Sequence, residues 1–321
     1  MMVSIIIPCY NKSKYIKDTI LSINNQDYRN WECLIIDDSS TDNSVEVILS
    51  LTKDNNRIHL IKNQENRGAN YCRNLGASKS KGDFIMFLDA DDVLTSSCIS
   101  SRVFSLSKSE GLDFGIFPVG TFNNIIGDNE FIWNKFNGNH VDRFLYHDLP
   151  WLICSVMWKK ESFIKTRGFC EKFERMQDVE FHTRFLLEEN PKYKTYPFLK
   201  PDVFYRINND RILNVLDFCE KDISAKHMFV NKFSQILRVQ NPKKVRFLKG
   251  TIFESYNLIF NFHKLGYISF KDLNNLVFNF LENTFACNKH LLSSTIKSLY
   301  IYLRIRNVYF SGMNKLFKIF F

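Results

Sequence analysis

Residues 84–92 read FIMFLDADD, a run of five apolar residues followed at once by clustered carboxylates. The apolar run has the length and composition of a buried strand. Asp89, Asp91 and Asp92 lie directly after it. Because like charges repel, a buried strand does not ordinarily end in such a cluster. This stretch therefore predicts a core strand with a site at its end.

Strand and helix patterns alternate through the residues before this stretch. Short β-rich runs are followed by segments with apolar residues at helical spacing. We expect strands at 3–8, 32–38, 57–63 and 83–89, and helices at 14–26, 42–53 and 68–82. This alternation predicts βαβ units, a mostly parallel twisted sheet and an α/β fold.

Candidate ligand-binding residues gather at the ends of three of these strands. Pro8, Tyr10 and Asn11 end the first strand, Asp37 and Asp38 the second, and the three acids the fourth. Right-handed crossovers place the carboxyl ends of the strands at one edge, where ligands bind in open α/β sheets. No Gly-rich loop follows the first strand, which argues against dinucleotide-binding and P-loop proteins.

The acids after the fourth strand suit a divalent cation. In an extended chain Asp89 and Asp91 point to similar sides, with the small Ala90 between them. Oxygen ligands favour a hard ion such as Mg²⁺ or Mn²⁺, which in turn favours a diphosphate. A solvated turn or a helix N-cap is the alternative, and we expect Asp92 to cap a helix that begins after it.

The pattern loosens beyond about residue 110. We expect strands at 113–120, 130–136 and 201–207, an apolar segment with two tryptophans at 148–164, and a helix at 175–190. From about residue 215 the chain reads as helices rich in Phe, Leu, Asn and Lys. A boundary between two parts of the chain is therefore expected near residue 215.

The net charge of +9 belongs to the C-terminal region. Residues 241–321 hold twelve Lys or Arg against three acids, whereas the first 240 residues balance. This distribution argues against a nucleic-acid binder. Segment 289–321 combines six basic residues and seven aromatic residues with no acid. It is typical of a membrane-surface segment, and a helical cap on the catalytic domain or an RNA-binding segment remain alternatives.

The sequence shows neither a secretory leader nor a membrane span, so we expect a cytoplasmic protein, peripheral at the inner face of the membrane. The eight cysteines are scattered, without CxxC pairs or metal-type spacing. They are expected to be reduced structural thiols.

Four segments together carry a resemblance to a known family. SIIIPCYN, IIDDSSTDNS, NRGANYCRNLGASKSKGDFIMFLDADD and MQDVEFHTRF, in this order, resemble the family 2 inverting glycosyltransferases. The resemblance covers roughly residues 3–210 and implies the nucleotide-sugar-binding fold called GT-A. It implies a catalytic domain at 1–215, with a nucleotide-sugar half at 1–110 and an acceptor half at 111–215, and a helical region at 216–321.

The resemblance also implies roles for individual residues on the donor side. The loop with Pro8, Tyr10 and Asn11 would meet the nucleobase and ribose, Asp37 and Asp38 the base, Arg67 the turn before a helix, Arg73 the nucleotide, and Arg206 the diphosphate. Asp89, Ala90 and Asp91 would form the DXD motif that holds Mn²⁺ or Mg²⁺. Asp91 is expected as the direct metal ligand, and Asp89 would face the ribose or a metal-bound water.

The general base is implied to be Asp178, the second residue of a pair that is Glu-Asp in the family and Gln177–Asp178 here. Its position near a helix N-terminus predicts modest basicity. Glu180 is the alternative base, although we expect it to pair with Arg184. Trp151 and Trp158 would form an apolar wall for a sugar or be core residues, and His182 is expected at the surface.

The resemblance implies a metal-dependent hexosyl- or N-acetylhexosaminyltransferase. It would move a sugar from a nucleoside-diphosphate donor, a UDP-sugar first, to a hydroxyl of a glycan or lipid-linked glycan in cell-surface polysaccharide assembly. The alternatives are a nucleotidyltransferase, which would show a Gly-rich basic loop after the first strand, and a catalytically impaired nucleotide-sugar-binding or scaffold protein. Gln177, and Asn208 at a position that is often His, keep the impaired protein open.

Overall fold

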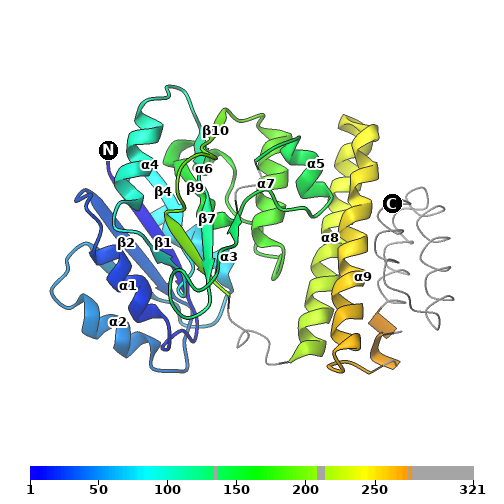
Figure 1. Ribbon diagram of the computed structural model, residues 1–321, viewed down its shortest axis with the longest axis horizontal. Helices are drawn as coiled ribbons and strands as arrows, with labels where there is room; N and C mark the ends of the chain where they lie inside the picture. Colours follow the sequence, from blue (N-terminus) through cyan, green and yellow to red (C-terminus); the bar gives the residue numbers. More distant parts are fainter. Residues whose placement is uncertain (134–135, 208–213, 270, 274, 277–321) are drawn as a thin grey trace. The chain divides into compact units, whose positions relative to one another are not determined.

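The computed structural model describes residues 1–133, 136–207, 214–269, 271–273 and 275–276 (Figure 1). It divides into two compact units, Met1–His140 with Leu149–Arg211, and Val141–Asp148 with Ile212–Phe321. The predictions made for Asn208 and for segment 289–321 lie outside the described residues. The domain boundary expected near residue 215 stays a prediction.

A seven-stranded, mostly parallel sheet with the order β10–β6–β9–β4–β1–β2–β3 forms the centre of the first unit. Its strands are β1 (Val3–Cys9), β2 (Trp31–Asp37), β3 (Ile58–Lys62), β4 (Phe84–Phe87), β6 (Phe114–Ile116), β9 (Val156–Lys159) and β10 (Tyr193–Thr195). Only β9 among them runs antiparallel to its neighbours β4 and β6. The predicted α/β fold with a mostly parallel sheet is confirmed.

A second sheet has the order β5–β11–β7–β8 and consists of β5 (Val93–Leu94), β11 (Val203–Arg206), β7 (Val119–Phe122) and β8 (Ile132–Trp133). The stretch 113–120, expected as one strand, contributes to both sheets through β6 and β7. Asp92 leads into β5 rather than into a helix, so its predicted role as a helix cap was wrong. The next helix, α4 (Cys98–Ser107), begins six residues later, after Ser97.

Helices cover both faces of the central sheet, which explains why β1 is apolar at successive positions. Ile5 and Ile7 belong to a core that includes residues of α1 (Ile16–Asn24), α2 (Ser44–Thr52) and α4. Ile6 lies toward α3 (Ala69–Lys79) on the other face. A Cβ atom at Gly76 of α3 would lie 2.4 Å from Cγ2 of Ile6. Glycine at this position therefore allows the helix to approach the sheet.

In the first unit, several helices and their aromatic side chains pack around β9. Short helices η1 (Ile153–Ser155) and α6 (Lys160–Lys165) flank β9, and α7 (Gln177–Glu188) follows. His182 of α7 stacks on Trp158 at a ring-centroid distance of 5.9 Å and meets Trp151 edge to face at 5.6 Å. His182 is 1% exposed, so its predicted surface position was wrong.

The second unit is helical in its described part, as predicted for the C-terminal region. α8 (Val215–Gln240) begins after Asn214, whose side chain accepts hydrogen bonds from two backbone N–H groups of the first turn. η3 (Pro242–Phe247) and α9 (Leu248–Lys264) follow, and α9 runs beside α8 (Figure 1). The end of α5 (His140–Leu145) belongs to this unit. No helix in the described ranges is both long and apolar enough to cross a membrane.

Candidate active site

The carboxyl ends of β1, β2 and β4 meet at one edge of the central sheet, as their parallel registers require. Cys9 at the end of β1 lies opposite Asp37 of β2, and Ile6 lies opposite Phe87 of β4. A cavity of about 250 Å³ opens at this edge, and we call it the strand-end pocket. Its lining includes Pro8, Tyr10, Lys12, Asp38, Cys72, Arg73, Asp89, Ala90, Asp91 and Gln177.

Two acids of the predicted DXD motif form ion pairs in this pocket. Nη2 of Arg73 donates to Oδ1 of Asp89 at 2.9 Å. The ammonium group of Lys12 donates to Oδ2 of Asp91 at 2.7 Å. Asp91 is only 1% exposed, so this carboxylate is almost withdrawn from solvent. Burying it costs free energy unless a positive group lies against it, and Lys12 meets that need.

Asp38 lines the pocket but also holds the turn before α3. Its carboxylate accepts hydrogen bonds from the backbone N–H groups of Arg67 at 3.0 Å and Gly68 at 2.7 Å. The side-chain amide of Asn63 donates to it at 2.8 Å. Gly68 has a φ of +85°, a conformation that favours glycine. The role predicted for Asp38 toward a nucleobase stays a prediction, since the structure shows it supporting this turn.

Four residues predicted for the donor side do not line the pocket, and three of them lie in the loops and strand end around it. Oδ1 of Asn11 accepts from the backbone N–H of Thr41 at 2.8 Å and so holds the following loop. Asp37 is buried at the end of β2. The guanidinium of Arg67 stacks over the ring of Tyr71, 3.5 Å from its centroid. These side chains shape the loops around the pocket, and in this structure they do not reach into it.

Arg206, expected to face a diphosphate, instead holds the acidic turn in place. Its Nε donates to the backbone carbonyl of Asp91 at 3.0 Å, and its Nη2 to Oδ2 of Asp18 at 2.8 Å. The backbone N–H of Arg206 donates to Oδ1 of Asp92 at 3.0 Å. Arg206 lines neither this pocket nor the one described next. The role expected for Arg206 toward a diphosphate stays a prediction, and in this structure its guanidinium holds the turn.

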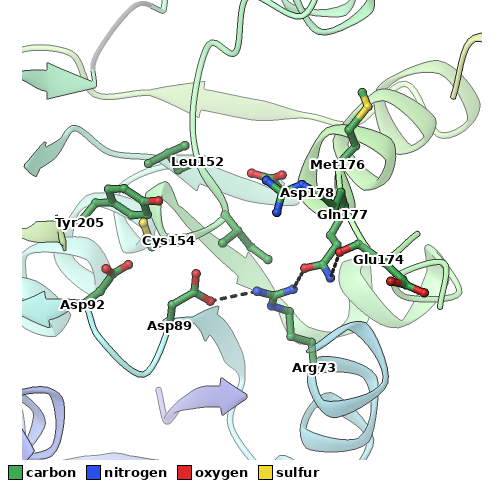
Figure 2. A pocket seen from close by; sticks show the side chains of 12 residues that line it. Arg73, Asp89, Asp92, Leu152, Cys154, Glu174, Met176, Gln177, Asp178 and Tyr205 are labelled. Carbon is green, nitrogen blue, oxygen red and sulfur yellow. Dashed lines mark hydrogen bonds and ion pairs between the residues drawn. The ribbon is translucent and has the colours of Figure 1, made fainter. Parts of the chain in front are cut away.

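A second cavity, of about 220 Å³, adjoins the first at the start of α7 (Figure 2). We call it the α7 pocket. It shares Arg73, Asp89 and Gln177 with the strand-end pocket. Its other lining residues are Asp92, Leu152, Ile153, Cys154, Glu174, Arg175, Met176, Asp178 and Tyr205.

Arg73 forms the wall between the two pockets. Figure 2 shows its guanidinium between Asp89 and Gln177. Nη1 donates to Oε1 of Gln177 at 2.7 Å and to Oδ1 of Asn70 at 3.3 Å. Because Gln177 is neutral, it orients the guanidinium without neutralising it. Among these three partners Asp89 is therefore the charged one.

Asp178 lies in the first turn of α7 and lines the second pocket, directly after Gln177. Its Oδ1 accepts the backbone N–H of Val179 at 3.0 Å. Burial raises the pKa of this carboxyl above its usual value, and nearby Asp89 raises it further, whereas Arg73 opposes the shift. The helix N-terminus favours the carboxylate form, and desolvation acts against it at this half-buried position.

Glu180 does not compete with Asp178 for the role of base. Its Oε1 accepts from Nε of Arg184 at 2.9 Å, which confirms the predicted pair one helical turn apart. Glu180 is 0% exposed and lines neither pocket. Trp151 and Trp158 are also 0% exposed. Of the two alternatives predicted for these tryptophans, the core position is confirmed, because both rings are packed away from the surface.

The acids of the strand-end pocket fit a divalent ion only in combination with a ligand. Among the residues that the structure describes, no group of three or more His, Cys, Asp or Glu side chains could hold a metal ion. Asp89 and Asp91 line one pocket together with Asp38, whose carboxylate already accepts backbone N–H groups of the turn before α3. Mg²⁺ in nucleotide sites typically takes one or two carboxylates and completes its shell with phosphate oxygens and water. The donor set therefore suits a hard ion bound together with a diphosphate.

Lys12 is the charged residue of the strand-end pocket that the sequence patterns did not predict. It follows Tyr10 by two positions in PCYNKS, just after β1. A single basic residue at the end of the first strand was the available signal. Leu152, Ile153 and Tyr205 were also missed, since the segments that carry them have no motif and reach the α7 pocket only through folding.

Comparison with known proteins gives a family. Residues 4–165, about half of the chain, match the model of a family described as "Glycosyl transferase family 2". The chain is 40% identical over 91 residues to the putative teichuronic acid biosynthesis glycosyltransferase TuaG of Bacillus subtilis, covering 28% of this chain and 36% of TuaG. It is 28% identical over 185 residues to a GalNAc(5)-diNAcBac-PP-undecaprenol beta-1,3-glucosyltransferase of Campylobacter jejuni, covering 53% and 55%. For TuaG and two further curated glycosyltransferases, of Haemophilus influenzae and Streptococcus pneumoniae, the match covers only 33–41% of the relative's own length.

A solved structure shares the fold. The S. aureus TarS fragment 1–349, crystallised in complex with UDP, is similar with a TM-score of 0.68 at 17% sequence identity. The similarity covers 95% of this chain and 87% of that chain. A structural similarity at 17% sequence identity is evidence for a shared fold, and it confirms the GT-A architecture predicted from the sequence.

Proposed function

The chain belongs to glycosyl transferase family 2, and we propose that it transfers a hexosyl or N-acetylhexosaminyl group, with inversion, from a UDP-sugar to a hydroxyl of a glycan or lipid-linked glycan. The observation that carries this proposal is the pair of adjoining pockets. The strand-end pocket gathers Lys12, Arg73, Asp89 and Asp91, and the α7 pocket presents Asp178 across the shared wall. A diphosphate donor fits the first pocket and a hydroxyl nucleophile the second.

Proton transfer is the task of Asp178. Its carboxylate accepts the proton of the acceptor hydroxyl while that oxygen attacks the anomeric carbon of the donor sugar. The bond between the anomeric carbon and the diphosphate oxygen breaks at the same time. Because burial raises the pKa of Asp178, it is a better proton acceptor than an exposed aspartate. Attack from the side opposite the leaving group inverts the anomeric centre.

Arg73 serves the leaving diphosphate. Its guanidinium is held by Asp89 and Gln177 on the wall between the pockets, where negative charge develops as the bond breaks. Asp91 and Asp89 would hold Mg²⁺ or Mn²⁺, which when bound supplies Lewis-acid stabilisation of that charge. The complex of the TarS fragment with UDP supports UDP as the nucleotide, and the name of the C. jejuni relative supports a lipid-linked acceptor.

An impaired, purely sugar-nucleotide-binding protein is the alternative. It is disfavoured because Gln177, which replaces an acid of the family pair, has a defined role in orienting Arg73. Asp178 is present and lines the pocket. Binding without turnover would be the signature of the impaired protein.

A thermal-shift screen of nucleoside diphosphates and their sugars, with and without Mn²⁺ or Mg²⁺, tests the proposal. UDP and one UDP-sugar should raise the Tm in the presence of the metal ion. Release of UDP from that sugar donor, measured with and without glycan acceptors, then separates an enzyme from a binding protein. Absence of stabilisation by every nucleotide would contradict the proposal.

Segment 289–321 would bring the enzyme to an anionic membrane surface on the cytoplasmic side, where lipid-linked acceptors are available. Attraction of basic residues to anionic lipid contributes about 1 kcal/mol per Lys or Arg near the surface. A variant that ends after residue 288 should lose binding to anionic vesicles while it keeps UDP binding. Undiminished vesicle binding would refute this location.

A further inference from the structure

In the strand-end pocket the ammonium group of Lys12 occupies the carboxylate of Asp91, which is also the expected ligand of a divalent ion. Lys12 lies on Oδ2 of Asp91 at 2.7 Å, and Asp91 is the carboxylate expected to bind a divalent ion. An ammonium group and a divalent cation repel each other strongly at such short range. A divalent ion on Oδ2 would also compete with the ammonium for the lone pairs of that oxygen. Simultaneous binding of both cations to this one carboxylate is therefore unfavourable.

Lys12 and Arg73 are held in different ways. The guanidinium of Arg73 donates to three side chains, those of Asn70, Asp89 and Gln177, and the residue is 5% exposed. The side chain of Lys12 is 26% exposed and, within the part of the chain that the structure describes, forms its ion pair with Asp91 alone. Arg73 is thus fixed in place, whereas the ammonium of Lys12 has room to move.

The backbone of Lys12 is anchored while its side chain reaches into the pocket. Its backbone N–H donates to Oγ of Ser44 at 2.7 Å, at the start of α2. The side chain lines the same cavity as Asp38, Asp89 and Asp91. A lysine has four rotatable side-chain bonds, so its ammonium can change partners within the pocket without any movement of the loop.

We propose that Lys12 is a positioning residue that exchanges Asp91 for the diphosphate of the donor. In the donor-free protein its ammonium neutralises Asp91. When a divalent ion takes Asp91, the ammonium transfers to the phosphate oxygens. The inference rests on the proposed function and deepens it, because it assigns Lys12 to the donor site.

The charges balance on both sides of this exchange. A nucleoside-diphosphate sugar brings negative charge, and the divalent ion brings positive charge to match it. Asp91 then has the ion as its partner, and Lys12 has the phosphates. The ion alone would displace Lys12 from Asp91, the one carboxylate with which it forms an ion pair among the described residues. The metal ion and the diphosphate should therefore bind cooperatively, each raising the affinity of the protein for the other.

Calorimetry on the full chain tests the exchange with three titrations: Mn²⁺ alone, UDP alone, and UDP with saturating Mn²⁺. K12M should bind Mn²⁺ alone about tenfold more tightly than wild type, because no ammonium competes for Asp91. The same variant should bind UDP in the presence of Mn²⁺ about tenfold more weakly. K17M, which removes an exposed lysine of α1, is the matched control and should behave as wild type.

K12R keeps a cation at the same position and should keep the weak Mn²⁺ affinity of wild type. A purely structural lysine would give a different result, because its loss would leave Mn²⁺ affinity unchanged or lower it. If the wild-type protein binds UDP with Mn²⁺, and folded K12M binds Mn²⁺ with unchanged or lower affinity, the exchange is overturned. The proposed function would be unaffected by that result. Failure of the wild-type protein to bind UDP with Mn²⁺ would overturn the proposed function together with the exchange.

Discussion

The strand-end pocket and the α7 pocket share a wall, but their carboxylates differ in environment. In the strand-end pocket Asp89 and Asp91 lie against Arg73 and Lys12, and both pairs are close enough for charge-assisted hydrogen bonds. In the α7 pocket burial raises the pKa of Asp178. The first arrangement keeps negative charge ready for cations, whereas the second prepares a proton acceptor. One sheet edge can therefore support both halves of a group transfer.

Replacement of Asp178, the proposed base in the α7 pocket, should have the largest effect on catalysis. Asp178→Asn removes the proton acceptor and preserves its size, so the rate of transfer should fall about 10²–10⁴-fold. UDP binding measured by calorimetry should stay close to that of wild type, since the amide leaves the strand-end pocket unchanged.

Glu188→Gln is the matched control, because Glu188 is an acid at the end of α7 and lines neither pocket. Its transfer rate should equal that of wild type. An Asp178→Asn protein that transfers sugar at the wild-type rate would move the base to another residue.

Replacement of an acid in the strand-end pocket should act on donor binding. Asp91→Asn removes the charge that a divalent ion needs, so metal-dependent UDP affinity should fall about 10–100-fold. UDP binding without metal should change much less, and the difference can be measured by calorimetry in chelator and in Mn²⁺. Asp54→Asn, an exposed acid after α2, serves as control. Equal losses with and without metal would contradict the assignment of Asp91.

A change in the shared wall should couple the two pockets. Gln177→Glu places a negative charge beside Asp178 and gives Arg73 a second anionic partner, so the pKa of Asp178 should rise further. The base works in its deprotonated form, so activity is lost as pH falls through this pKa. The acid limb of the pH–rate profile should therefore move to higher pH, by roughly 0.5–1 unit.

Gln177→Leu removes the hydrogen bond to Arg73 and adds no charge, so it measures the effect of losing that contact without a new negative charge. Its acid limb should move less than that of Gln177→Glu. A profile for Gln177→Glu that coincides with that of Gln177→Leu would show that the two pockets are not coupled through charge.

The smallest expected effect concerns the packing beside Asp178. Burial lowers the pKa of His182 to about 3, whereas in the unfolded chain it is about 6.5. The unfolded state then binds more protons, so this stability is present above about pH 6.5 and is lost as pH falls toward 3. At about pH 5 the loss is roughly 2 kcal/mol.

His182→Phe should reduce this acid sensitivity, measured as the free energy of unfolding in urea at neutral pH and at about pH 5. His59→Phe, at an exposed position of β3, is the control and should keep the wild-type pH dependence. Identical pH dependence in His182→Phe and wild type would show that the buried imidazole does not control acid stability.

Periodicity and strand-end chemistry predicted the part of the site that is local in sequence. The alternating pattern over the first ninety residues gave the strands, their direction and the edge where Tyr10, Asp38 and Asp91 meet. The pair Glu180–Arg184 was also predictable, because it depends only on helical spacing. These successes share a cause, since each follows from the geometry of one element or of consecutive βαβ units.

Side chains whose environment is made by distant segments were predicted wrongly or left open. Trp151, Trp158 and His182 are buried together because β9 and α7 pack against each other, which no local pattern shows. The contacts of Arg206 with the acidic turn could not be predicted for the same reason, since its partners Asp18 and Asp91 come from other parts of the chain.

The sequence by itself determined the fold class, the sheet edge that carries the site, and Asp89, Asp91 and Asp178 as its candidate acids. Only the tertiary structure decided how those acids are charged and paired. Lys12 meets Asp91 across 79 positions of sequence, and Arg73 meets Gln177 across 104. The physical reason is that the state of a carboxylate depends on burial and on the charges around it, and folding sets both.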